Sequence, residues 1–189
     1  MTKAKKGKKK SFNSFLEKNL KYLILGLILI ILFRKYLLFI VLSIPTLIMG
    51  MITMKASRVV PHISIESISS AATLIGYIWG WKAGLIFGFV VGMIGWIQVG
   101  LVKHTTITTA VFMGFNGMMG GILSSFFSSF YVAHTMAFLI RAPINYIIMG
   151  AITSDPIENF MHSFGDSAFS VFIHVHWINL LYILASPFI

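Results

Sequence analysis

The stretch that decides the fold runs from Leu74 to Trp96 and reads LIGYIWGWKAGLIFGFVVGMIGW. Five glycines recur in it at a spacing of four: Gly76, Gly80, Gly84, Gly88 and Gly92. In water such a run is a poor helix, because each interior glycine costs about 1 kcal/mol relative to alanine. In a bilayer the same spacing leaves a smooth stripe along which two helix backbones can approach closely. The stretch therefore predicts membrane helices that pack through glycine.

The composition of the whole chain supports a membrane protein. Of the 189 residues, 57% are hydrophobic and only 11% are Asp, Glu, Lys or Arg, whereas a soluble domain carries about 25% charged residues. The chain has no cysteine, which excludes disulfides and thiolate metal sites. No nucleophile motif, phosphate loop or dinucleotide fingerprint is present. We therefore expect an all-α integral membrane protein that is not an enzyme and holds no cofactor.

Basic residues are concentrated at the N-terminus. Eight of the fifteen Lys and Arg residues lie within residues 1–21. A lysine run can bind nucleic acid, but a run placed just before an apolar segment is typical of a cytoplasmic anchor that contacts anionic lipid. We therefore predict a basic cytoplasmic tail over residues 1–21 of a multi-pass protein of the cell membrane, with lipid and no nucleic acid as its partner.

A membrane-crossing helix needs about 20 apolar residues, and six such segments follow residue 36. They are 36–54, 68–81, 84–102, two spans within 105–153 that divide near 128–133, and a last span from 168 to the end. Residues 36–189 are thus predicted to form a six-helix bundle. The apolar run at 22–35 is shorter, and it is either an interfacial helix or a seventh span. The distribution of basic residues does not separate six spans from seven, because both arrangements place equal numbers of them inside.

Strongly polar groups at membrane depth mark function by default, because burying them in lipid is costly. Arg141 lies in the middle of a predicted span, and Asn145 follows it by one helical turn. The arginine needs a partner, which is an anionic ligand, a carboxylate such as Glu66, or backbone carbonyls. Asn116 lies among glycines and either bonds a neighbouring helix or contacts a ligand.

A second polar group falls in the predicted loop 154–166. Glu158, His162 and Asp166 are spaced by four, so on a helix they would share one face and could bind a divalent metal ion. The alternative is a solvated loop that caps the bundle. We treat these three residues as weak metal candidates.

The glycine-rich stretch 74–96 resembles the hairpin between the second and third spans of energy-coupling factor transporter S components, which are small membrane proteins that bind vitamins or similar nutrients. Trp177–Leu181, reading WINLL, resembles the start of that family's last helix. The resemblance covers roughly residues 36–189. It implies six spans, both termini in the cytoplasm, and loops 55–67 and 154–167 outside near the substrate. It also implies that Asn179 lies at the outer end of the last helix and contacts ligand.

These observations predict a substrate-binding membrane subunit of a vitamin-like nutrient uptake transporter. Its partners would be a small-molecule substrate, a membrane coupling subunit and ATPase subunits. The candidate substrate-binding residues are Glu66, Asn116, Arg141, Asn145 and Asn179. Two alternatives stay open. A structural or scaffolding membrane protein predicts that Arg141 pairs internally and that no cavity opens between the last three helices. A metal-ion permease subunit requires Glu158, His162 and a further ligand to converge on one ion.

Overall fold

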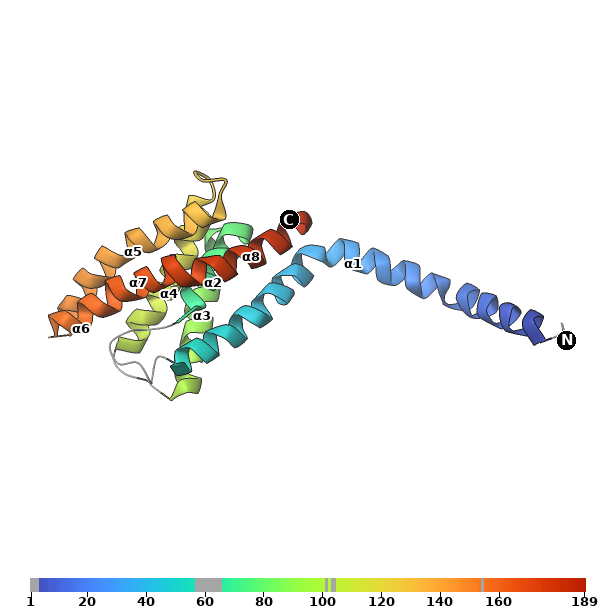
Figure 1. The fold of residues 1–189 in the computed structure, drawn as a ribbon, viewed down its shortest axis with the longest axis horizontal. Helices are drawn as coiled ribbons and strands as arrows, with labels where there is room; N and C mark the ends of the chain where they lie inside the picture. Colours follow the sequence, from blue (N-terminus) through green and yellow to red (C-terminus); the bar gives the residue numbers. More distant parts are fainter. Residues whose placement is uncertain (1–3, 57–65, 101, 103–104, 154) are drawn as a thin grey trace. The chain divides into compact units, whose positions relative to one another are not determined.

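The computed structural model describes residues 4–56, 66–100, 102, 105–153 and 155–189. Over these ranges the chain is helical apart from short connections, and no strand occurs in them. The elements (Figure 1) are α1 (Ala4–Ala56), α2 (Ile68–Trp79), α3 (Trp81–Val99), α4 (Thr105–Leu123), α5 (Phe130–Ile152), α6 (Pro156–Phe160), η1 (Met161–Gly165), α7 (Asp166–Phe169), η2 (Ser170–His174), α8 (Val175–Ala185) and η3 (Ser186–Phe188). The all-α prediction is confirmed.

Five helical stretches are long and apolar enough to cross a membrane. They are Tyr22–Ala56, α3, α4, α5 and the continuous C-terminal stretch Pro156–Phe188, which we call the C-terminal helix. Helix α2 has only 12 residues, which at 1.5 Å per residue is about 18 Å, roughly half of the hydrocarbon thickness. The chain is therefore a multi-pass membrane protein in which one helix is too short to cross by itself.

The chain divides into two compact units, one formed by residues 1–38 and the other by Phe39–Pro187. Helix α1 continues through the boundary, so the sequence-based separation of a short helix at 22–35 from a span at 36–54 does not appear as a break in the backbone. From Tyr22 to Phe33 α1 carries no charged residue, and every residue except the half-buried Gly26 is exposed. A helix that is apolar on every side requires an apolar environment such as lipid.

In the larger unit, α2, α3 and α4 pack against one another through glycine. A Cβ atom added at Gly76 or Gly84 would collide with the backbone of Gly117 in α4, and one at Gly88 would collide with the backbone of Met113. A Cβ atom at Gly92 would meet the side chain of Met113. Close glycine packing is thus confirmed at Gly76, Gly84, Gly88 and Gly92, and α4 supplies the opposing glycines.

Gly80 has a different role from the one predicted. The stripe was expected to include it, and the turn was expected at residues 81–83. Instead Gly80 is itself the whole turn between α2 and α3, with φ of 91°, and no atom lies within 4 Å of the position of a Cβ. Only glycine adopts this positive φ without strain. The other four glycines therefore belong to two helices that meet at Gly80, and not to one continuous helix face.

The last helix begins earlier than predicted. Residues 154–166 were expected to form a polar loop, but the described part of this segment is helical from Pro156. Asp155 starts the helix, because its Oδ1 accepts hydrogen bonds from the backbone N–H groups of Ile157 (2.9 Å) and Glu158 (3.0 Å). Proline at the first helical position favours the same start. The polar residues that suggested a loop include Asn159, Ser163, Asp166 and Ser167, all of which are buried.

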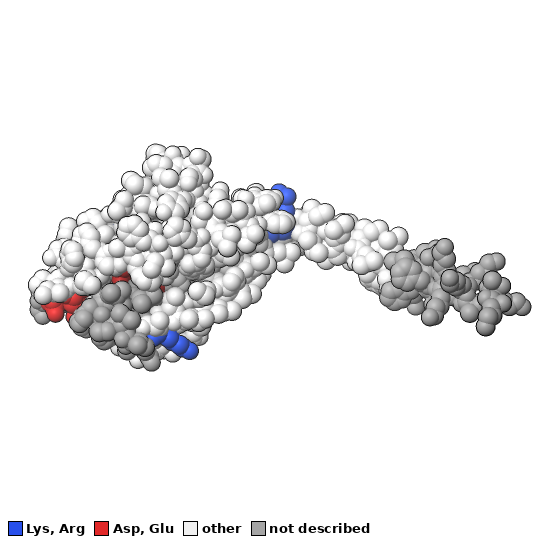
Figure 2. Space-filling model, viewed as in Figure 1, with Lys and Arg blue, Asp and Glu red and all other residues white. Residues whose placement is uncertain are grey.

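The surface of the larger unit agrees with the assignment of the segment from Pro156 onward to a membrane helix. Figure 2 shows a face of the helices that is almost entirely uncharged, with acidic atoms gathered near the place where Figure 1 labels α6. Asp155, which is exposed, and Glu158, which is half-buried, lie at this end of the C-terminal helix. Charges thus gather at a helix end, and the lateral surface in view is apolar, as a bilayer requires.

The side chain of Tyr77, on α2, bonds the segment that joins α4 to α5. Removing its hydroxyl group gives a first test of the packing of this core. The Tyr77 hydroxyl donates to the carbonyl oxygens of Phe127 (3.0 Å) and Ser128 (2.8 Å). In Tyr77→Phe the ring contacts remain but these bonds are lost, so we expect a decrease of about 1 kcal/mol in the free energy of unfolding. The measurement is unfolding in mixed micelles of increasing SDS content. Tyr36→Phe, at a side chain that is 71% exposed, is the control and should have no effect.

Candidate functional site

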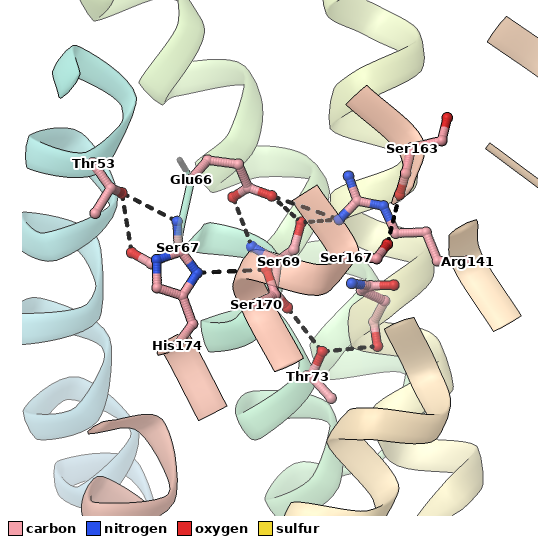
Figure 3. Close-up of polar contacts among 11 residues, drawn as sticks. Thr53, Glu66, Ser67, Ser69, Thr73, Arg141, Ser163, Ser167, Ser170 and His174 are labelled. Atoms are coloured by element: carbon pink, nitrogen blue, oxygen red, sulfur yellow. Dashed lines mark hydrogen bonds and ion pairs between the residues drawn. The ribbon is translucent and has the colours of Figure 1, made fainter. Parts of the chain in front are cut away.

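Buried polar side chains gather where the N-terminal end of α2 meets α4, α5 and the C-terminal helix. Twelve of them, each at most 6% exposed, form what we call the polar seam. They are Glu66, Ser69, Ser70 and Thr73 at α2, Asn116 on α4, His134, Arg141 and Asn145 on α5, and Ser163, Ser167, Ser170 and His174 on the C-terminal helix. Figure 3 shows most of them in one close-up, with their side chains directed toward the space between these helices.

Helical spacing explains why so many polar groups meet. On the C-terminal helix, Ser163, Ser167, Ser170 and His174 follow one another at intervals of four, three and four, which places them on one face. Helix α5 packs against this helix through η1, α7 and η2. The two are joined by residues 153–155 only, so they run antiparallel. Each presents its polar face to the other, and α2 begins beside them.

The centre of the seam is a buried ion pair. A terminal nitrogen of Arg141, Nη1, lies 3.6 Å from Oε1 of Glu66 and donates to Oγ of Ser69 at 2.8 Å. The Ser69 hydroxyl in turn donates to Oε1 of Glu66. The Ser69 backbone N–H donates to Oε2 of the same carboxylate at 2.9 Å. Glu66 and Arg141 are each 2% exposed, and Figure 3 shows this triad in the middle of the view.

This arrangement identifies the partner of Arg141. Of the partners considered from sequence, the carboxylate of Glu66 is the one found. The carboxylate also bonds a first-turn N–H of α2, where the helix dipole favours negative charge. The guanidinium carbon lies 5.6 Å from the centre of the Phe138 ring, which adds a cation–π contact. The two opposite charges are therefore held in place by α2 and α5 and balance each other.

Other seam residues make further hydrogen bonds, mostly within their own helices. Ser167 Oγ donates to the Ser163 carbonyl at 2.7 Å, and Ser170 Oγ lies 3.5 Å from Nδ1 of His174. Thr73 Oγ1 donates to the carbonyl of Ser69 at 2.8 Å. These serines and threonines bond mainly to carbonyls of their own helices, which leaves lone pairs available to another molecule.

Four seam residues carry polar atoms that have no hydrogen-bond partner among the described residues. They are the amide oxygen and nitrogen of Asn116, both ring nitrogens of His134, and the hydroxyls of Ser70 and Ser163. The His134 ring lies between two aromatic rings, with centres 5.7 Å from Phe130 and 4.7 Å from Phe138. A buried polar group without a partner costs about 1 to 3 kcal/mol. These atoms are therefore the places where a bound solute or buried water would be stabilised.

Two π-helical turns occur in the C-terminal helix, at η1 and η2. They contain three seam residues, Ser163, Ser170 and His174. A π turn is rare, and it appears frequently at functional sites because it disrupts the regular ladder of backbone bonds. Both turns lie where the helix faces α5.

The structure unites four of the five predicted substrate-binding residues. Glu66 and Arg141 are in contact, Asn145 lies one turn beyond Arg141, and Asn116 approaches α2 through its carbonyl, which lies 3.4 Å from Thr73 Oγ1. Asn179 is not part of the seam. The resemblance placed it at the start of the last helix, but that helix begins at Pro156, and Asn179 lies half-buried in α8, near the opposite end.

The predicted metal candidates do not assemble. His162 Nε2 lies 3.5 Å from Oε1 of Glu158, and both side chains are partly exposed. Asp166 is buried at 6% exposure. Within the part of the chain that the structure describes, no group of three His, Cys, Asp or Glu side chains is placed to hold a metal ion.

Sequence reasoning missed most of the serines and both seam histidines. His134 lies next to the predicted division between two spans near 128–133, yet it is fully buried. The available signals were the spacing of Ser163, Ser167 and Ser170 and the polar run at Ser67–Ser70 in front of an apolar helix. Ser69 and Ser70 were counted as part of the predicted span 68–81, and Ser163 lay in a segment interpreted as a loop.

Comparisons with protein-family models, with curated proteins and with solved structures found no match for this chain.

Proposed function

We propose that this chain is the substrate-binding membrane subunit of an uptake transporter, and that it holds a small polar solute in the polar seam. The observation that carries the proposal is the set of unpartnered atoms on Asn116, His134, Ser70 and Ser163. In a membrane such atoms have no bulk water to bond, so their burial is favourable only if another molecule bonds them. They come from α2, α4, α5 and the C-terminal helix, the elements whose buried polar residues form the seam.

The rest of the architecture suits this role. The α2–α3–α4 core is held backbone to backbone, which gives a rigid body against which α5 and the C-terminal helix close. The sequence has no phosphate-binding loop, so the energy for release would come from separate subunits. In this proposal they are a membrane coupling subunit and ATPase subunits, the solute is a vitamin-like nutrient, and the basic N-terminal tail lies on the cytoplasmic side against anionic lipid.

Native mass spectrometry of the protein in lipid nanodiscs tests the proposal. We expect the wild-type protein to retain a small molecule, visible as added mass, and we expect its occupancy to fall about tenfold or more in Asn116→Leu and in His134→Phe. Each variant removes a bond worth about 1.4 kcal/mol, which corresponds to a tenfold change in affinity. Leucine and phenylalanine approximate the branched shape of asparagine and the planar ring of histidine without their polar atoms.

Matched controls separate a binding defect from a general one. Val111→Leu lies on α4 and Leu139→Ile on α5, the helices that carry Asn116 and His134, and both side chains are largely exposed. These controls should retain the solute fully, and all variants should elute as the wild type does in size exclusion. A wild-type protein without added mass, or equal occupancy in all five proteins, would contradict the proposal.

The scaffold alternative is favoured by one observation, the internal pairing of Arg141 with Glu66. A structural protein needs such a pair only to hold α2 against α5. It predicts that the unpartnered seam atoms bond water alone, so that no added mass is seen in the same measurement and the variants of Asn116 and His134 change stability but not composition.

A further inference from the structure

The charges in the seam restrict the kind of solute that it can hold. Among the twelve seam residues, Glu66 is the acid and Arg141 is the base whose charge is permanent. Asp166, which is buried next to Ser167 on the C-terminal helix, has an interaction of its own. They face each other at 3.6 Å and share Ser69 as a bridge. A charged solute would have to draw one of them away. The other would then be left buried and unpaired, which costs about 3 to 5 kcal/mol.

Both members of the pair are also fixed by bonds to α2. Glu66 accepts from the backbone and the side chain of Ser69, and Arg141 donates to the same hydroxyl. The N-terminus of α2 therefore already has its anion, supplied by the chain itself. An anionic solute would compete with the Glu66 carboxylate for this helix end. The carboxylate has a high effective concentration there, because Glu66 lies only two residues before the first residue of α2.

The groups that remain available are neutral and can both donate and accept. The Asn116 amide offers two N–H donors and a carbonyl, and the Ser70 and Ser163 hydroxyls each offer one donor and two lone pairs. A neutral His134 imidazole offers one donor and one acceptor. Hydroxyl and amide groups on a solute match this set, because each of them also donates and accepts. A carboxylate or phosphate matches it poorly, since it only accepts.

The surroundings of His134 add a shape requirement. Its ring lies against Phe130 and Phe138, and Phe130 in turn stacks on Tyr182 at 5.4 Å between ring centres. The part of a solute that reaches His134 therefore meets ring faces as well as ring nitrogens. Carbon-bound hydrogens of a polyol or the edge of an amide pack favourably on such faces.

We propose that the solute of the polar seam carries no ionised group at neutral pH and binds through hydroxyl or amide groups. This assignment rests on the proposed function, because it names the chemical class of the molecule captured there. It excludes carboxylates, phosphates and amines as the bound group, although Arg141 by itself would suit an anion.

The experiment identifies the molecule that the protein itself retains. Wild-type protein in nanodiscs is denatured in organic solvent, and the released compound is analysed by accurate mass, fragmentation and electrophoretic mobility at pH 7. We expect a compound of zero mobility with hydroxyl or amide groups and no ionisable group. We also expect it to be about tenfold or more depleted in Ser70→Ala, Asn116→Leu and His134→Phe, and undiminished in Val111→Leu and Leu139→Ile.

The outcomes distinguish the two proposals. A released compound that bears a carboxylate, phosphate or amine and is depleted in the seam variants refutes the charge assignment and leaves solute capture standing. A compound equally abundant in the seam variants and the controls, such as a co-purified lipid, refutes both. Absence of any compound from the wild-type protein also refutes both. Ser70→Ala, which removes a single oxygen, remains informative if the larger replacements impair folding.

Discussion

Gly84→Ala is expected to lower the free energy of unfolding by at least about 3 kcal/mol, because the added methyl group meets backbone and not a movable side chain. A Cβ at this position would collide with the carbonyl of Gly117 and with the Cα of Gly76. Relief would require α3 to move away from both α2 and α4. The measurement is the unfolding midpoint in dodecylmaltoside–SDS mixtures, followed by tryptophan fluorescence.

Gly150→Ala is the matched control for this prediction. Gly150 is also a helical glycine, on α5, but no atom lies within 4 Å of its Cβ position. The same substitution there should be neutral or stabilise by up to about 1 kcal/mol through helix propensity. If Gly84→Ala and Gly150→Ala unfolded at the same SDS fraction, the close approach of α3 to α4 would be wrong.

The second large effect is expected at the ion pair. Arg141→Met keeps the unbranched apolar stem of the side chain but leaves the Glu66 carboxylate buried without its counter-charge, which should destabilise by about 3 to 5 kcal/mol. Glu66→Met should cost a similar amount for the converse reason. The double variant removes both charges, so it should be substantially more stable than the sum of the two single effects predicts. A double-mutant cycle of SDS unfolding free energies measures this coupling.

Lys82→Met provides the reference for removing an unburied charge. Lys82 is exposed, and its ammonium lies 5.5 Å from the centre of the Trp81 ring. Its loss should cost no more than about 1 kcal/mol. A cycle in which the Glu66 and Arg141 effects simply add, or an Arg141→Met effect as small as that of Lys82→Met, would show that the pair does not hold α2 to α5.

The sequence was sufficient for the features that depend on local composition. Apolar length predicted the helices, and α3 and α5 end within about three residues of the expected positions, whereas α4 ends at Leu123, before the expected division near 128–133. The glycine spacing predicted close packing, because small side chains repeated every four residues allow two helix backbones to approach closely in a bilayer. Glu66 was one of three kinds of partner considered for Arg141, because a buried arginine requires a counter-charge or hydrogen-bond acceptors.

The remaining features depend on which helices pack together, and the sequence of a single segment does not determine this. Asn116 and Ser70 belong to one site only because α2 lies against α4 and α5. The segment 154–166 was misread because its polar residues face a neighbouring helix instead of water, and periodicity gives the direction of a face but not its environment. Gly80 was counted as a packing residue because spacing alone does not distinguish a stripe from a turn.

The backbone contact of Gly84 with Gly117 also has a consequence for how this protein can change during evolution. Every replacement of a glycine introduces at least a Cβ, so these two positions accept no alternative residue without movement of whole helices. Positions such as Val111 or Leu139, whose side chains face outward, accept any residue that lipid tolerates. A scan of all substitutions should therefore show the strictest sequence constraint at glycines that contact backbone, and the greatest freedom at exposed apolar positions.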